Sequence, residues 1–457
     1  MTLLKRMVIL AIVTFGVGLV ALDARATYGA RVTADEPQYL LTAISLSEDF
    51  DLDISDEIAD ERFRSFHEVP LNEQTIALND SGQRLSPHDP LFPIFLALPV
   101  LLGGWVGAKV ALAFVAGLTS AASLFLACRR FDAELGPATW VVGFLFISPP
   151  LTSYATQLYP AMPAALFIVL GVIAVTGLPN WRWEVIAIVS IIALPWLSVK
   201  YVPYSAVLAW FVIRNSFRIS VSRVFVQIGF LAGAGAIYLL VHHQVYGGWT
   251  VYAAGDHFVN SEFLVFGNNP NYLARSIRFF GLLIDRGFGL IPWNPAYLAV
   301  PVALTWFAKV RRKGSAVLLA IVVVGWIMAT WVALTMHGWW WPGRQIVPVL
   351  PLLAVVIAVA VKSVRPLIVA FVIAATIGLF SWLWLIYETS NDYLTLVFDF
   401  EKTSNPWYQL WRLFFPDHRV NGTGDQVLTW VWGVFLTISA IGTWCKTSSL
   451  DGKCQSH

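Results

Sequence analysis

Long apolar stretches alternate with short polar segments along almost the whole chain. A helix needs roughly 17–25 mostly apolar residues to cross a bilayer. Stretches of about that length predict an all-α, polytopic membrane protein with about twelve transmembrane helices, within a range of about eleven to thirteen. We place the spans at 7–22, 105–127, 137–153, 160–177, 183–198, 201–213, 224–243, 290–308, 315–335, 345–361, 367–387 and 426–445.

Two apolar regions fit this pattern less simply. Residues 90–103, PLFPIFLALPVLLG, are too short for a span and contain three prolines, so we predict an interfacial or re-entrant segment there. The break at PWLSVKYVP divides 183–213 into two short spans. One tilted span is the alternative, and it would invert the topology of everything that follows.

The short basic loops predict the orientation of the chain. With the N-terminus inside, every short loop rich in Lys and Arg falls on the cytoplasmic side, as the positive-inside rule requires. All but four of the 28 acidic residues then fall outside. The prediction is one transmembrane domain over 1–457, with a long extracytoplasmic loop at 23–104 that holds interfacial helices. Further extracytoplasmic loops are predicted at 244–289 and 389–425.

Composition agrees with a membrane protein and limits the other possibilities. Only 13% of the residues are charged and 57% are hydrophobic, which argues against a soluble domain. No basic run suggests binding to nucleic acid. The first 26 residues also resemble a cleavable secretory signal. An uncleaved first span is favoured, because an acidic pair follows it directly.

That pair, Asp35 and Glu36, is the first candidate for chemistry. Asp35 is suited to cap a helix with Pro37 in its first turn. Three apolar side chains at helical spacing would then lie on the membrane: Leu40, Leu41 and Ile44. The alternative is a general base, because a carboxylate at a half-desolvated surface can take a proton from an attacking hydroxyl. The two interpretations are compatible if one residue of the pair caps and the other faces a cavity.

An acidic stretch follows at 48–61, EDFDLDISDEIADE. The spacing of Asp49, Asp51 and Asp53 is that of a calcium loop, but Ile54 stands where such a loop needs glycine. Asp60 stands where it needs glutamate. A solvated acidic face is therefore the favoured interpretation.

Four more polar residues are candidates: His88 and Asp89 just before the predicted re-entrant segment, and Lys200 and Arg344 near predicted outer span ends. His88 and Asp89 either orient an acceptor sugar or bind a headgroup, or they form a turn before Pro90. Lys200 and Arg344 either extend to the interface as isolated cations or face a cavity and bind an anion. A lipid phosphate would supply that anion, and arginine would bind it through two nitrogens.

Six stretches together resemble one family. They are ADEPQYLLTAISL, SPHDPLFPIFLALP, QLYPAMPAALF, LPWLSVKYVP, LLIDRGFGLIPWNPAYL and WPGRQIVPVLP. In this order, after one span and an outer Asp-Glu pair, they resemble the GT-C superfamily of integral-membrane glycosyltransferases. That superfamily includes protein O-mannosyltransferases, the lipid A aminoarabinose transferase and uncharacterised bacterial proteins. The resemblance runs from the first outer loop to about residue 351.

The resemblance implies a transferase in the bacterial plasma membrane with its active site on the extracytoplasmic side. It would move a sugar from a polyprenyl-phosphate donor to a hydroxyl of a glycan, lipid or protein acceptor, with inversion. It implies Asp35 as general base with Glu36 as second candidate, and Arg344 and Lys200 as ligands of the donor phosphate. The substrate-binding candidates are His88, Asp89, Tyr39, Tyr159 and Tyr201. The scheme requires no cofactor and leaves a divalent metal open.

A multi-span transporter or lipid flippase is the alternative function, because many carriers also have twelve spans with both termini inside. Carriers place charges or helix breakers near mid-span. This chain has mid-span prolines, such as Pro195 and Pro348, but few mid-span charges. The transferase is therefore preferred, and a non-catalytic assembly partner with the same fold is a third possibility.

Overall fold

The chain folds almost entirely into helices in a computed structural model that describes residues 1–75, 82–255, 270–361 and 365–454. The first half contains α1 (Leu3–Leu19), α2 (Glu36–Glu48), α3 (Ser55–Ala59), α4 (Leu91–Arg130), α5 (Leu135–Phe146), α6 (Ala161–Thr176), α7 (Trp181–Leu197), α8 (Val202–Phe217) and α9 (Val221–Tyr246). The second half contains α10 (Tyr272–Arg275), α11 (Arg278–Ile284), α12 (Leu290–Trp293), α13 (Ala299–Val310), α14 (Ser315–Ile327), α15 (Leu350–Ala360), α16 (Arg365–Ser390), α17 (Pro406–Trp411) and α18 (Thr423–Cys454). Short 3₁₀ or π turns that matter below are η1 (Arg62–Ser65), η3 (Val199–Tyr201) and η8 (Met328–Val332).

Every predicted span overlaps at least one of these helices. Within the described residues, five helices are long and apolar enough to cross a membrane: Leu91–Arg130, Val221–Ala254, Ser315–Val332, Ile368–Ser390 and Thr423–Thr447. Four more are apolar but shorter: Leu135–Phe146, Ala161–Thr176, Pro295–Val310 and Val347–Ala360. The all-helical, multi-span class is therefore confirmed, whereas the count of twelve crossings stays a prediction.

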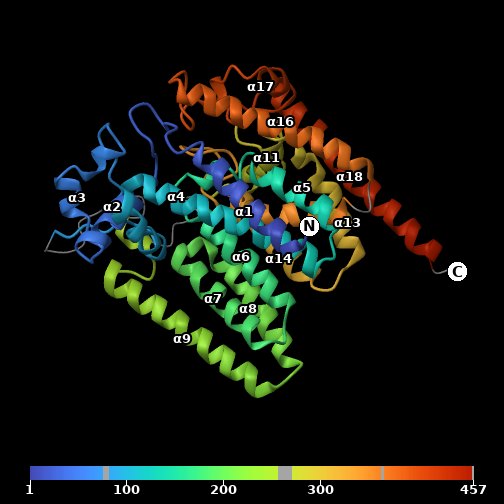
Figure 1. Cartoon of the computed structure of the whole chain (residues 1–457), viewed down its shortest axis with the longest axis horizontal. Helices are drawn as coiled ribbons and strands as arrows, with labels where there is room; N and C mark the ends of the chain where they lie inside the picture. The colour runs from blue at the N-terminus through green and yellow to red at the C-terminus, as the bar shows by residue number, and fades with distance from the viewer. Residues whose placement is uncertain (76–81, 256–269, 362–364, 455–457) are drawn as a thin grey trace.

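The centre and the edges of the bundle differ in what they bury. Every residue of α15 is buried, and this helix packs against α4, α5 and α13. A helix that is apolar on all sides and buried on all sides forms the core of a large bundle. Figure 1 shows α9 along one edge and α16 and α18 along the opposite edge. α9 and α18 expose many apolar side chains, as lipid-facing helices do.

The predicted segment 90–103 and the predicted span 105–127 are the two arms of α4. The helix is broken between them, because Gly103 and Gly104 leave helical geometry. Gly104 has φ +56° and ψ −148°, a conformation that side chains other than glycine's rarely allow. The break thus lies where the sequence analysis divided the two segments.

α2 packs on α4 at one end of the molecule (Figure 1). The prediction that its apolar face lies on the membrane is wrong, because the three residues concerned are buried within the protein: Leu40, Leu41 and Ile44. The prediction that Asp35 caps α2 through its side chain is also wrong. Asp35 occupies the position before the helix, but its carboxylate makes no capping bond.

Candidate active site

A cavity of about 820 Å³ lies where the first outer loop, the break between α7 and α8, and the segment after α14 meet. Seven of the nine residues predicted as site residues line it: Asp35, Tyr39, His88, Asp89, Lys200, Tyr201 and Arg344. The other two, Glu36 and Tyr159, do not line it. The structure therefore brings together residues that lie up to 309 positions apart in the chain.

Asp35 and Arg344 form an ion pair inside this cavity. The Arg344 side chain is 9% exposed and that of Asp35 is 22% exposed, so the pair is largely removed from water. Asp35 Oδ1 also accepts a hydrogen bond of 3.4 Å from Gln74 Nε2. Burial alone would raise the pKa of Asp35, but nearby positive groups, with the Arg344 guanidinium first among them, together outweigh burial and hold that pKa well below its usual range. Asp35 is thus an ionised carboxylate and the counter-ion of Arg344.

Two aromatic rings hold Arg344 in place. Its Cζ lies 4.0 Å from the ring centroid of Tyr159 and 4.5 Å from that of Trp340, within the range of cation–π attraction. Tyr159 is buried, and its hydroxyl donates to the carbonyl of Thr33 over 3.4 Å. The predicted substrate-binding residue Tyr159 therefore contacts Arg344 rather than the cavity.

Lys200 lies in η3, outside the helices on either side, and turns toward the same cavity. Its Nζ lies 5.3 Å from the ring centroid of Tyr201. In the part of the chain that the structure describes, no carboxylate lies within ion-pair distance of this ammonium group. Burial, together with the charge of Arg344, lowers the pKa of Lys200 to about 7. The cavity therefore offers an anion two cations: Arg344, which is already paired with Asp35, and Lys200, which has no carboxylate partner among the described residues.

His88 and Tyr201 line the cavity, and each carries a buried polar atom that has no partner. His88 Nε2 and the Tyr201 hydroxyl are buried and make no hydrogen bond among the described residues. The His88 ring lies on that of Tyr39, with centroids 4.4 Å apart. Burial lowers the pKa of His88 to about 4, so its imidazole is neutral at pH 7. Buried polar atoms of this kind normally have a hydrogen-bond partner, and a polar ligand would supply one.

Asp89 lines the cavity, but its oxygens are already engaged. Oδ1 accepts from the Tyr238 hydroxyl over 2.8 Å and lies 3.0 Å from His242 Nε2. Oδ2 accepts from the backbone N–H of Val199 over 2.8 Å. Asp89 thus ties α9 to the turn that carries Lys200. The sequence analysis missed Tyr238 and His242, although two polar residues four apart in an apolar helix were a usable signal.

Glu36, the second candidate for the base, is turned away from the cavity. It is 1% exposed, and its carboxylate accepts from the backbone N–H groups of Thr33 and Leu158, over 2.9 and 2.6 Å. Burial raises the pKa of Glu36 to about 7. The carboxylate joins the start of α2 to the segment before α6, and it thereby fixes the backbone from which Asp35 extends.

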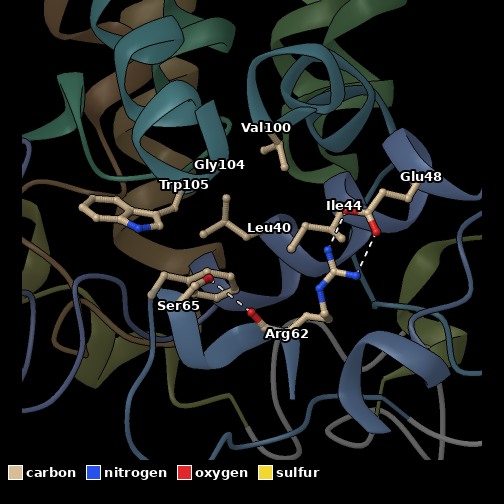
Figure 2. A pocket seen from close by; sticks show the side chains of 9 residues that line it. Leu40, Ile44, Glu48, Arg62, Ser65, Val100, Gly104 and Trp105 are labelled. Carbon is tan, nitrogen blue, oxygen red and sulfur yellow. Dashed lines mark hydrogen bonds and ion pairs between the residues drawn. The ribbon is translucent and has the colours of Figure 1, made fainter. Parts of the chain in front are cut away.

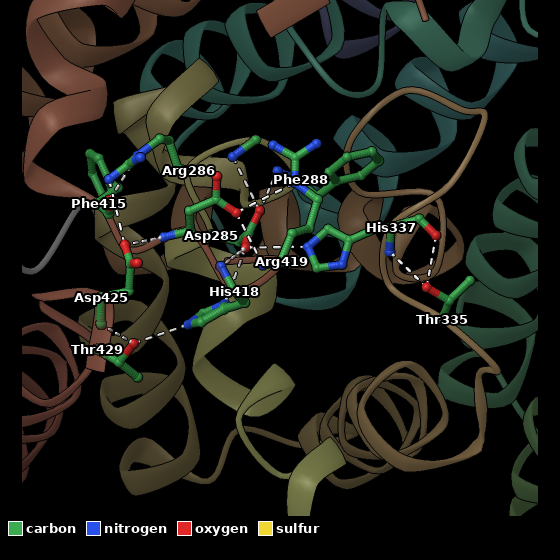
Figure 3. Close-up of polar contacts among 12 residues, drawn as sticks. Asp285, Arg286, Phe288, Thr335, His337, Phe415, His418, Arg419, Asp425 and Thr429 are labelled. Atoms are coloured by element: carbon green, nitrogen blue, oxygen red, sulfur yellow. Dashed lines mark hydrogen bonds and ion pairs between the residues drawn. The ribbon is translucent and has the colours of Figure 1, made fainter. Parts of the chain in front are cut away.

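A buried carboxylate on another loop supports the segment that carries Arg344. Asp285 follows α11, and its Oδ1 accepts from the N–H groups of Gly287 and Phe288, over 3.1 and 2.7 Å. Its Oδ2 lies 3.3 Å from His337 Nε2 and accepts from the N–H of His418 over 3.1 Å. Figure 3 shows Asp285 between these two histidines. The sequence analysis singled out none of the three, because they come from separate outer segments.

The site as a whole suits an amphiphile with an anionic head. The polar part of the lining consists of two cations, two carboxylates, an imidazole and phenol groups, from Arg344, Lys200, Asp35, Asp89, His88, Tyr39 and Tyr201 among others. Another part of the lining is apolar and comes from the end of α14 and the start of α8, with Met328, Ala329, Val332, Val202 and Pro203 among its residues. A concave, mostly apolar site with a few convergent polar groups is the usual form of a small-molecule site.

Comparison with known proteins identifies the fold. No family model matches this chain, and no curated protein does. Two solved structures match, both of ArnT from Cupriavidus metallidurans. ArnT bound to undecaprenyl phosphate has 16% identity and a TM-score of 0.55, and ArnT in the apo state has 15% and 0.53. Each match covers 96% of this chain and 73% of ArnT. The chain therefore has the fold of ArnT, which confirms the fold that the resemblance of its sequence stretches implied.

Proposed function

We propose that this protein is a membrane glycosyltransferase that moves a sugar from a polyprenyl-phosphate donor to an acceptor hydroxyl on the extracytoplasmic side. The observation that carries the proposal is the shared cavity, which is lined by Asp35 paired with Arg344 and by Lys200 from the turn between α7 and α8. The fold supports it, because the matching ArnT structure is bound to undecaprenyl phosphate.

The donor phosphate is assigned to Arg344 and Lys200. Asp35 already compensates the charge of Arg344, whereas no described carboxylate pairs with Lys200. A singly charged phosphodiester would complete the charge balance of the cavity. Such pairing matters here because an uncompensated charge away from water is costly. The guanidinium has five donors, so Arg344 can bind a phosphate oxygen while it still contacts Asp35.

The isoprenoid chain is assigned to the apolar part of the lining. The last turn of the α14 helix is a π turn, η8, and its residues Met328, Ala329 and Val332 line the cavity with Val202 from the start of α8. Single π turns inside or at the end of α-helices occur often at functional sites. This part of the lining would hold the apolar chain next to the bilayer while the phosphate stays on the cations.

The proposed reaction is a single displacement. Asp35 takes the proton of an acceptor hydroxyl, and the oxygen attacks the anomeric carbon as the bond between that carbon and the phosphate oxygen breaks. The bonding electrons leave with the phosphate, and Arg344 and Lys200 stabilise the charge that develops on it. Attack from the side opposite the phosphate inverts the anomeric centre.

Donor binding would also make Asp35 a stronger base. Without donor, the pKa of Asp35 is held low by Arg344 against the opposite effect of burial. A phosphate on Arg344 would compete for the guanidinium and bring a second negative charge close to the carboxylate. Both changes raise the pKa of a buried acid. The base would therefore be weak until the donor occupies the cavity.

The proposal is tested with the full-length protein in lipid vesicles that contain a polyprenyl-phosphate sugar labelled in the sugar. With an extract of envelope acceptors, we expect label to leave the carrier and polyprenyl phosphate to accumulate in equal amount. Vesicles without the protein are the control. Movement of the labelled lipid between leaflets, with the sugar still attached, would contradict the proposal and indicate a flippase.

Transfer should also depend on the charge of Lys200. Because the pKa of Lys200 is about 7 without donor, the ammonium form that binds phosphate is lost as the pH rises through 7. We expect kcat/KM for the donor to fall above that pH, by up to about tenfold per pH unit, since this ratio reports groups of the free enzyme. Lys200→Arg should move the fall to higher pH, because arginine keeps its charge. An unchanged alkaline limb in this variant would remove Lys200 from donor binding.

A further inference from the structure

Three carboxylates gather at the end of α2 that lies away from Asp35. Asp49 ends α2, and Asp56 and Glu57 belong to the first turn of α3. One carboxylate oxygen of each lies within 4.8 Å of the others. None of the three lines the 820 Å³ cavity, so this cluster is separate from the proposed active site.

Glu57 distinguishes the cluster from an ordinary acidic surface. It is 2% exposed, and its Oε2 is buried without a hydrogen-bond partner among the described residues. A buried, unpartnered carboxylate oxygen is costly, because it has given up water and gained no donor. Asp49 and Asp56, by contrast, are exposed and offer their oxygens from the solvent side.

The nearest cation is already engaged elsewhere. Arg62 lies next to these acids, but both of its terminal nitrogens donate to Glu48, over 2.8 and 2.6 Å. Figure 2 shows this pair at a pocket of about 150 Å³ between α2 and the break in α4. Within the described ranges, no Lys, Arg or His lies within ion-pair distance of any of the three carboxylates. No described basic side chain therefore pairs with the cluster.

The neighbouring acids have other roles. Asp51 Oδ1 accepts from the Ser45 hydroxyl over 2.8 Å and from the N–H of Asp53 over 3.0 Å. Asp53 Oδ1 accepts from the N–H groups of Ser55 and Arg84, over 3.1 and 2.8 Å. Asp51 and Asp53, two of the three acids of the calcium-loop spacing, thus fold the turn themselves. Asp49, the third, remains together with Asp56 and Glu57, which lie outside that spacing.

We propose that Asp49, Asp56 and Glu57 form a binding site for a divalent cation of the calcium class. Calcium takes six to eight oxygen ligands and accepts carboxylates in flexible geometry, so three carboxylates and water suffice. The cation would bridge the three side chains and give the buried Glu57 oxygen a partner. It would clamp the end of α2 to α3 and so stiffen the helix whose other end presents Asp35.

The site is tested on the full-length protein after removal of metal with EDTA, by equilibrium dialysis against ⁴⁵Ca²⁺ and by thermal unfolding. We expect one saturable site with a Kd on the order of 10⁻⁴–10⁻³ M, the range of extracellular calcium modules. Saturating Ca²⁺ should raise Tm by a few degrees, because it binds only the folded state. Asp56→Asn changes an exposed side chain and should weaken binding at least tenfold. Glu57→Gln should abolish it.

Asp60→Asn is the matched control, because it removes the same charge from an exposed neighbour outside the cluster. It should bind Ca²⁺ as the parent does. Absence of saturable binding up to about 10 mM would overturn the proposal, and so would equal binding by the parent and Glu57→Gln. A higher Tm of Glu57→Gln in calcium-free buffer, with no effect of Ca²⁺ on the parent, would show instead that Glu57 holds a proton. None of these measurements uses donor or acceptor, so their outcome does not depend on the transferase activity.

Discussion

Asp35→Asn is expected to slow sugar transfer by about 10²–10⁴-fold, the contribution typical of a general base. The same substitution should leave donor binding intact or tighten it, because it frees Arg344 from its counter-ion. Slower transfer without weaker donor binding distinguishes a general base from a residue that only shapes the cavity. Single-turnover transfer and equilibrium binding of polyprenyl phosphate, measured on the same preparations, give both values.

The neighbouring acid provides the comparison for this experiment. Glu36→Gln removes a carboxylate one residue away that the structure turns toward Thr33 and Leu158. We expect it to lower Tm, because a carboxylate that accepts two backbone N–H bonds is lost, and to reduce transfer less than Asp35→Asn. Undiminished transfer by Asp35→Asn would remove it as the base. Full loss in Glu36→Gln at unchanged Tm would assign the base to Glu36.

Arg344→Lys is expected to lower kcat by about 10²–10³-fold, the effect typical of losing one preorganised donor to a developing anion. The charge is kept, but the planar fork that can reach both Asp35 and a phosphate is lost. The ring contacts with Tyr159 and Trp340 also favour a flat guanidinium over an ammonium group. Donor affinity should weaken together with kcat, as measured by steady-state transfer over a range of donor concentrations.

The coupling between Arg344 and Asp35 is measured separately, through stability. Arg344→Met leaves Asp35 in the cavity without its counter-ion and should lower Tm. Adding Asp35→Asn to that variant should restore part of the loss, because no unpaired charge then remains. Additive changes in Tm would show that the two side chains do not interact. They would also contradict the proposal that donor binding frees Asp35 from Arg344 to act as the base.

The helices themselves follow from the sequence. A helix that crosses lipid must satisfy its backbone internally and cover it with apolar side chains. Each span is therefore visible in the sequence as a continuous apolar stretch, and a helix overlaps every predicted span. The division of 90–127 into two segments was also predicted, because residues 90–103 are too short for a span and contain three prolines, and the helix breaks at Gly103 and Gly104. Local chemistry was enough for these features.

The direction in which each polar side chain points could not be predicted from the sequence in the same way. Successive residues of a helix point about 100° apart, so Asp35 and Glu36 point in different directions. Only the packing of α2 on α4 decides between them. The same packing buried Leu40 and Leu41, which by spacing alone suited lipid equally well. Apolar periodicity predicts that a helix face is removed from water, but it does not show whether lipid or protein covers that face.

The sequence by itself determined that this chain is a helical membrane protein with ionisable residues at its outer span ends, because transfer from water to lipid is decided residue by residue. Only the tertiary structure decided that Asp35, Lys200 and Arg344 share one cavity and that Asp285 meets His337 and His418. Those contacts join segments from 52 to 309 positions apart. Long-range packing brings such segments together, and no local pattern in the chain records which of them will meet.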